Sequence, residues 1–169
     1  MRLGPLAVPL LLTSACATGI ASLPPMDPGP QQSAVYLYRQ HAEPTSRTVD
    51  VLLDGKAIAT LEEATFTRLL VASGRRTVRM AWPEDTQAGA TLELKLEPGK
   101  RYFISVETSR VGGGLAGDVA VDGGTRFASR GGAGSAATIQ SKVRSVNPLD
   151  GESTVKACCS YLPPLVGKR

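Results

Sequence analysis

Two motifs in this 169-residue chain match catalytic or cofactor sites by their residue types and spacing. Ser153-x-x-Lys156 has the spacing of a serine nucleophile and its lysine, a pair that acts at the start of a helix with a Lys-Thr-Gly motif, which does not follow here. We predict a strand over residues 154–159, where the two side chains would face opposite sides. Gly112-Gly-Gly114-Leu-Ala-Gly117 resembles a dinucleotide-binding turn, but residues 118–124 are not expected to form the helix that such a turn needs. Neither motif therefore predicts a site.

Acid–base and metal chemistry have little support in the remaining residues. His41 is the single histidine, so it has no second histidine with which to share a metal. Asp118 and Asp122 lack the alternating ligands of a calcium loop. We predict no catalytic residue, no metal and no cofactor, and hence that the protein is not an enzyme.

Cys158 and Cys159 are adjacent, and the remaining cysteine is Cys16. Neighbouring residues on a strand point to opposite faces, so we expect one thiol to be buried and the other partly exposed. A disulfide between the two neighbours, which would need a distorted backbone, and a bridge to another chain remain as alternatives. Two thiols are too few for a structural zinc site.

The N-terminus has the three parts of a secretory signal. Arg2 precedes an apolar run over residues 3–12, and small residues stand before Cys16. The run is too short to span a membrane, and no later stretch has 18 consecutive apolar residues. We therefore predict an exported protein with no membrane-spanning helix after its signal.

Ser14-Ala15-Cys16 resembles the lipobox of bacterial lipoproteins, although Thr13 stands where that motif usually has Leu. The resemblance implies a signal peptide over residues 1–15, diacylglycerol on the Cys16 thiol and an acylated (palmitate-type) new N-terminus. Two or three acyl chains anchor a protein stably where one does not. Ala17, rather than Asp, after the cysteine implies sorting to the outer membrane, facing the periplasm. The alternative is cleavage after Ala17, which would give a secreted or soluble periplasmic protein.

The remaining chain is predicted to be one all-β domain behind a tether. Residues 16–32 are rich in Pro, Gly and Gln and are expected to form a flexible tether after the lipidated cysteine. Period-two alternation then recurs, with few aromatics (5%) and many turn residues. The predicted fold is a small antiparallel β-sandwich of about seven to nine strands over residues 33–160. A Gly-rich loop covers residues 109–137, and a tail covers residues 161–169.

The alternation also predicts which side chains face inward. Val49–Leu53 and Lys56–Leu61 are expected to form a hairpin around Asp54-Gly55, because that dipeptide favours a tight turn. In the strand that starts at Thr91, the leucines should point inward and Glu93 and Lys95 outward. The expected inward leucines are Leu92, Leu94 and Leu96.

Four short motifs occur in order: Tyr36-x-Tyr-Arg39, Asp54-Gly-Lys56, Gly74 before a basic strand, and Pro98-Gly-Lys-x-Tyr-Phe103. Together they resemble an uncharacterised family of bacterial lipoproteins, a domain of unknown function, and secondarily the PEGA-type surface domains. Both resemblances cover less than half of the chain. They imply a small β-sandwich and bring no catalytic residues.

The composition narrows the class of function. A formal net charge of +4 is small for a nucleic-acid-binding protein, and the cluster of Arg75, Arg76 and Arg79 is interpreted as a solvated strand face. We expect a membrane-anchored cell-envelope lipoprotein that acts as a non-enzymatic accessory or protein-interaction module, with the membrane and an envelope protein as partners. The alternative is a small-ligand or glycan-binding sandwich. Its binding residues would be the aromatic side chains Tyr36, Tyr38, Trp82 and Tyr102.

Overall fold

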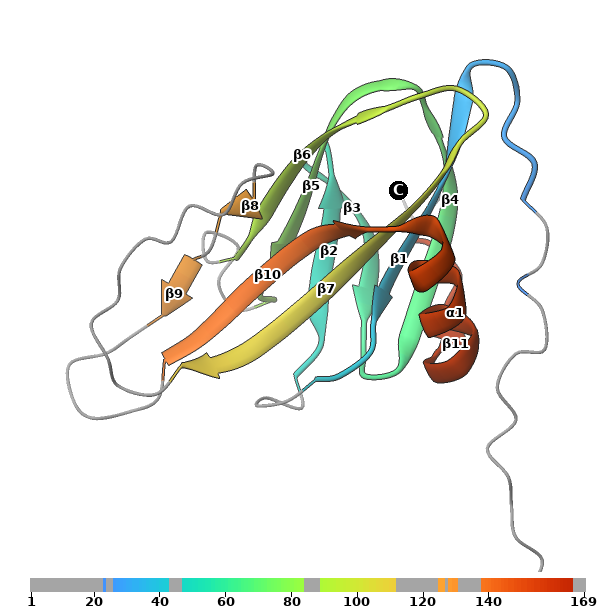
Figure 1. Cartoon of the computed structure of the whole chain (residues 1–169). Helices are drawn as coiled ribbons and strands as arrows, with labels where there is room; N and C mark the ends of the chain where they lie inside the picture. Colours follow the sequence, from blue (N-terminus) through green and yellow to red (C-terminus); the bar gives the residue numbers. More distant parts are fainter. Residues whose placement is uncertain are drawn as a thin grey trace, which may run out of the picture.

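The computed structural model describes residues 23, 26–42, 47–83, 89–111, 125–126, 128–130 and 138–165. In these residues two sheets pack against each other, and one helix, α1 (Pro148–Cys158), lies on the outside (Figure 1). The strands are β1 (Gln32–Arg39), β2 (Val49–Leu53), β3 (Lys56–Leu61), β4 (Thr65–Ala72), β5 (Gly74–Ala81), β6 (Thr91–Leu96), β7 (Arg101–Val111), β8 (Thr125–Arg126), β9 (Ala128–Arg130), β10 (Thr138–Val146) and β11 (Ser160–Tyr161). The predicted all-β sandwich is confirmed.

The two sheets have different strand orders. The six-stranded sheet runs β11-β4-β1-β7-β10-β9, and the five-stranded sheet runs β3-β2-β5-β6-β8. Most neighbours are antiparallel, but β1 is parallel to β7 and β11 is parallel to β4. Parallel strands need a long connection, and the chain between β1 and β7 builds β4 and most of the five-stranded sheet. The long connection leaves β1 in the interior of the six-stranded sheet, paired on both sides.

The predicted hairpin between β2 and β3 is present. Asp54 and Gly55 have φ values of +49° and +81°, the pair of positive angles that a two-residue type I′ turn requires. The Asp54 carboxylate also accepts a hydrogen bond from the backbone N–H of Thr77 at 2.9 Å. It forms an ion pair with Arg76 at 3.0 Å. The turn therefore both closes the hairpin and joins it to β5.

Side-chain alternation along β1 divides the interior into two cores. Val35 and Leu37 belong to the core between the two sheets. Tyr36 and Tyr38 point to the other face, where they pack in a second core with α1 through Val155. We call the face that carries this second core the outer face of the six-stranded sheet. β1 is thus buried on both faces, and one side of the sandwich has a third layer.

The strand predicted over residues 154–159 is wrong, because α1 occupies these residues up to Cys158. Asn147 caps the helix by accepting a hydrogen bond from Leu149 N at 2.9 Å, and Pro148 begins it. An Asn cap followed by Pro at the first helical position is a typical helix start. Thr154 and Val155 are β-branched and favour strands locally, but packing of Val155 into the second core outweighs this preference.

The prediction of a loop over residues 109–137 is wrong where the structure describes this segment. β7 continues to Val111, and two short strands within the segment extend the sheets at their edges. β8 pairs with β6, and β9 pairs with β10. Backbone pairing at a sheet edge needs no large side chains, so the Gly-rich composition concealed these strands. Residues 112–124, 127 and 131–137 lie outside the described residues.

Both ends of the predicted domain extend further than expected. Leu23, predicted to lie in the flexible tether, is only 9% exposed and joins the second core, and Met26 packs against the same core. After Cys159, β11 pairs with β4 instead of starting a tail. The backbone N–H of Leu165 then reaches the Ile58 carbonyl at 2.8 Å, so this segment crosses from one sheet to the other. Residues 166–169 lie outside the described residues.

Candidate functional site

Cys16, the predicted lipidation site, lies outside the described residues, but the segment that follows it enters the fold at Leu23. This N-terminal segment, Leu23 and residues 26–31, borders a hollow of 330 Å³ on the outer face of the six-stranded sheet. The hollow is lined by Leu23, Met26, Asp27, Pro28, Tyr36, Gly99 and Arg101.

No helix in the described residues is long and apolar enough to cross a membrane.

An ion-pair network joins the rim of this hollow to α1. The Glu152 carboxylate pairs with Arg101 at 3.2 Å and with Lys156 at 2.7 Å. The hydrogen bond from Lys156, with a smaller effect of Arg101, lowers the pKa of Glu152 below its ordinary range. Because the network is partly exposed, it contributes little to the stability of the fold, and its Arg101–Glu152 pair joins α1 to β7.

The aromatic residues of the predicted ligand-binding alternative are mostly core residues. Tyr36, which is 1% exposed, stacks on Phe103 with ring centroids 4.7 Å apart. Tyr38 and Trp82 are also buried, and burial raises the pKa of Tyr38. Tyr102 is partly buried, and its hydroxyl accepts a hydrogen bond from Glu97 N at 2.8 Å. These four side chains do not form an exposed platform.

An exposed apolar surface occurs at the edge of the outer face instead. We call it the edge strip and define it by Arg68, Leu70 and Tyr161. Leu70 and Tyr161 are 42% and 43% exposed, and the Arg68 guanidinium lies over the Tyr161 ring at 5.3 Å. The sequence did not reveal this strip, since Tyr161 was assigned to a tail. The alternation of Phe66, Arg68 and Leu70 along β4 was the available signal.

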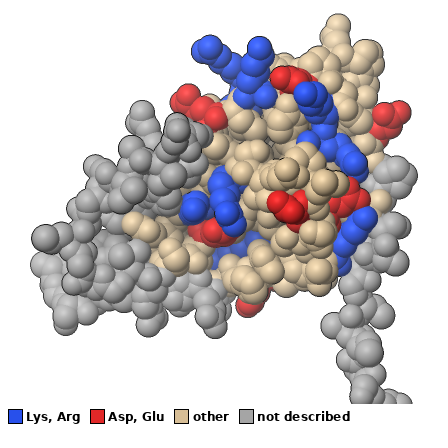
Figure 2. Space-filling model, in the orientation of Figure 1, with Lys and Arg blue, Asp and Glu red and all other residues tan. Residues whose placement is uncertain are grey.

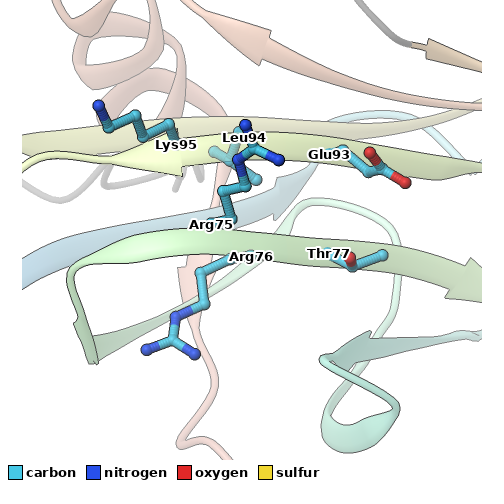
Figure 3. Close-up of a pocket in the computed structure, with 6 residues that line it drawn as sticks. All are labelled: Arg75, Arg76, Thr77, Glu93, Leu94 and Lys95. Atoms are coloured by element: carbon cyan, nitrogen blue, oxygen red, sulfur yellow. The ribbon is translucent and has the colours of Figure 1, made fainter.

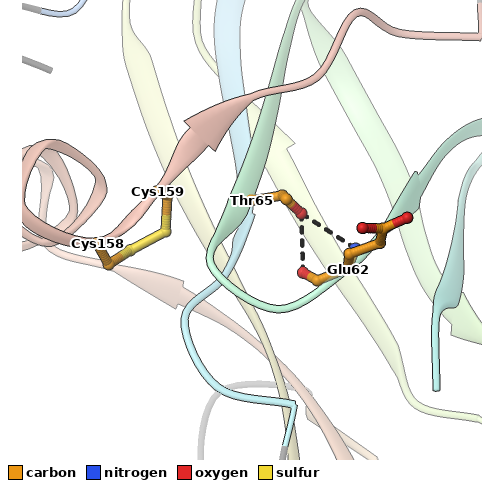
Figure 4. Close-up of a disulfide and its surroundings, with 4 residues drawn as sticks. All are labelled: Glu62, Thr65, Cys158 and Cys159. Carbon is orange, nitrogen blue, oxygen red and sulfur yellow. Dashed lines mark hydrogen bonds between the residues drawn. A yellow bond between two sulfur atoms is a disulfide. The ribbon is translucent and has the colours of Figure 1, made fainter. Parts of the chain in front are cut away.

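Cys158 and Cys159 form a disulfide between adjacent residues, which was one of the predicted alternatives (Figure 4). Cys159 is buried in the second core and Cys158 is partly buried. The pair lies where α1 ends and the chain turns into β11. The backbone N–H of Ser160 donates a hydrogen bond to the Ala64 carbonyl at 2.8 Å. The next residue, Thr65, forms side-chain hydrogen bonds with the Glu62 backbone.

The residues of the discounted motifs are not brought together into a site. Ser153 and Lys156 lie on α1 and not on a strand, and their contacts are local. The Ser153 hydroxyl donates to the Asp150 carbonyl at 2.9 Å. Lys156 is paired with Glu152. His41 is exposed, and Asp118, Asp122 and residues 112–117 lie outside the described residues. Within the part of the chain that the structure describes, no group of three His, Cys, Asp or Glu residues could hold a metal.

The basic cluster of β5 is divided between two faces. Figure 3 shows Arg75 reaching over β6 and Arg76 pointing the opposite way, as strand alternation requires. Arg76 is bound to Asp54 and to the Ala72 carbonyl. Both arginines line a shallow hollow, which they share with Thr77, Glu93, Leu94 and Lys95. On the side seen in Figure 2, blue and red side chains alternate over the described surface instead of forming a field of one sign.

Arg39 is a buried arginine that the sequence analysis named only as part of a motif. It is fully buried, and its guanidinium donates to the carbonyls of Ala42, Arg47 and Leu61. Burial lowers the pKa of this guanidinium. Since the contacts join β1 to the following loop and to the end of β3, the role of Arg39 is structural.

Comparison with known proteins identifies no relative of the chain. No known protein family, curated protein or solved structure matches the chain. The class of protein must therefore be argued from the fold and its surfaces.

Proposed function

We propose that the protein is a lipid-anchored protein of the cell envelope whose β-sandwich serves as a non-enzymatic accessory or interaction module. The observation that carries the proposal is the position of Leu23. The described fold begins at this buried residue, seven positions after the cysteine of the lipobox-like motif. On this proposal the chain consists of an export signal, a cysteine that is acylated and a folded domain that follows almost directly.

The interior of the domain supports a binding role over catalysis. Its buried polar side chains serve the fold: Arg39 binds backbone carbonyls, and Ser33 donates to the Glu97 carbonyl at 2.7 Å. The ion pairs that Glu152 forms with Arg101 and Lys156 are partly exposed to solvent, and they engage the three charges with one another. The glycan-binding alternative loses support, because three of its four aromatic side chains are buried.

The proposal places the domain at the outer membrane, on its periplasmic side, with an envelope protein as its partner. Its test is fractionation of cells that express the wild-type protein and Cys16→Ser. The wild-type protein should remain with membranes after a salt wash, and the variant should leave them. Cys158→Ser with Cys159→Ser is the matched control, since it removes sulfur without touching the anchor and should remain with membranes. Equal retention of all three proteins would refute the anchor.

A further inference from the structure

We infer that the edge strip formed by Arg68, Leu70 and Tyr161 lies against the membrane surface in which the protein is anchored. The inference rests on the proposed lipidation of Cys16 and adds a definite orientation of the domain. It follows from three observations: where the N-terminal segment docks, how much chain precedes it, and which side chains surround the docking site.

The docking site fixes one end of the tether. Leu23 belongs to the second core together with Phe66, on the outer face of the six-stranded sheet. The Phe66 ring in turn contacts the Tyr161 ring, with centroids 5.4 Å apart. The edge strip therefore borders the core into which the N-terminal segment inserts.

The other end of the tether is limited by chain length. Seven residue steps separate Cys16 from Leu23, and a fully extended chain covers at most about 25 Å over that number of steps. This is shorter than the diameter of roughly 35 Å expected for a domain of this size. If the acyl chains on Cys16 are in the bilayer, this short tether keeps the outer face of the sheet close to the lipid headgroups. A flexible tether from Cys16 to residue 32, as the sequence predicted, would let the domain rotate freely.

The chemistry of the edge strip suits a lipid interface. Two of the four large apolar side chains that are exposed in the described residues, Leu70 and Tyr161, lie on this edge. Tyrosine combines an apolar ring with a polar hydroxyl and favours the headgroup region. Arginine can extend its charge to phosphates while its stem covers apolar surface. The guanidinium of Arg68 already lies over the Tyr161 ring.

The strip is too small to hold the protein on a membrane by itself. Its apolar side chains are only partly exposed, so each has limited area left to bury. A short tether compensates by raising the local concentration of lipid around the strip, which turns a weak contact into a populated one. The proposed contact is accordingly a consequence of the anchor and orients the domain without replacing the anchor.

The test uses the full mature lipoprotein in vesicles of phosphatidylethanolamine and phosphatidylglycerol. Single nitroxide labels are placed at Leu70→Cys and, on the outer side of the other sheet, at the exposed Glu93→Cys. Collisions with oxygen and with a water-soluble nickel complex are then compared by electron paramagnetic resonance. Flotation of the labelled protein with the vesicles is measured first.

The inference predicts that the oxygen-to-nickel accessibility ratio at position 70 exceeds that at position 93 by about twofold or more. Equal ratios in a protein that floats would overturn the inference and leave the anchor standing. Failure to float would overturn the anchor and the inference with it. Inserting roughly 20 Gly/Ser residues after Ala21 should lower the ratio at position 70, because the longer tether dilutes the contact. An undiminished ratio would overturn the claim that chain length places the strip.

Discussion

Gly151 of α1 lies directly against Phe103 of β7: a Cβ atom added at Gly151 would stand 2.3 Å from the Phe103 Cβ. This approach is closer than any side chain allows, so the helix can lie this near the sheet only because position 151 is glycine. Phe103 also stacks on Tyr36, which transmits the contact to β1.

Gly151→Ala should therefore destabilise the fold by about 1–3 kcal/mol, although alanine is the better helix former. The change would force α1 away from Phe103. Ser153→Ala, at an exposed position of the same helix, should be nearly neutral. Urea unfolding of the two variants measures the difference, and a Gly151→Ala variant as stable as Ser153→Ala would show that α1 is not held this close.

The strand register of β6 makes a second prediction. Leu96 is buried and Glu93 is exposed, so Leu96→Asp should cost several kcal/mol, whereas Glu93→Ala should change stability by less than about 0.5 kcal/mol. Leu94→Asp should be milder than Leu96→Asp, because Leu94 is only partly buried, opposite Arg76. A lower thermal midpoint of unfolding for Glu93→Ala than for Leu96→Asp would mean that the register is shifted by one residue.

The N-terminal segment makes a third prediction. Leu23→Ala should lower stability by about 1–3 kcal/mol, since the Leu23 side chain is almost completely removed from water. It should also expose residues 23–31 to limited proteolysis. Asp27→Ala, an exposed change in the same segment, is the control and should do neither. Identical cleavage of the two variants would argue that the segment is not docked in solution.

The Glu152 network makes the domain weakly sensitive to acid. The pKa of Glu152 is lowered in the folded state, so its ion pairs stabilise the fold above the ordinary value of 4.5 and lose this effect as the pH falls through the lowered value. Glu152→Gln should cost less than about 1 kcal/mol at neutral pH. The wild-type protein and the variant should converge in stability in acid, and a difference that stays constant with pH would exclude the ion pairs as its cause.

Reduction of the Cys158–Cys159 disulfide should have a small effect on stability. Adjacent cysteines close the shortest possible loop, for which loop-closure entropy gives about 1 kcal/mol. Alkylation of the denatured protein should modify neither cysteine before reduction and both afterwards, as mass spectrometry would show. Modification of both without reduction would contradict the disulfide.

Much of the fold follows from local sequence. The remaining parts are determined by tertiary contacts. The boundaries of β2 and β3 agree with the alternation of their side chains, since each has one face toward the core between the sheets. The helix α1 is not predicted by the sequence analysis because Thr154 and Val155 are β-branched and favour a strand, although Asn147-Pro148 is a helix start signal. Its glycine at position 151 is explained only by Phe103, which lies 48 residues earlier in the chain.

The candidate functional residues likewise differ in whether local sequence reveals them. Cys16 can be proposed as a lipidation site from the sequence, because a lipobox-like motif lies in one continuous stretch of chain. The edge strip combines Arg68 and Leu70 of β4 with Tyr161 of β11, and the pairing of these two strands is set by the way the chain returns from α1. No local pattern encodes that return, so the sequence could indicate the β4 part of the strip but not its completion by Tyr161.

The central claim is the lipid anchor, and mass spectrometry of the mature N-terminal peptide tests it most directly. The account predicts a mature chain that begins at Cys16 and carries the mass of two or three acyl chains, part of which is released by mild alkali. A mature chain that begins at Thr18, with no acyl mass, would contradict the account and identify a soluble exported protein.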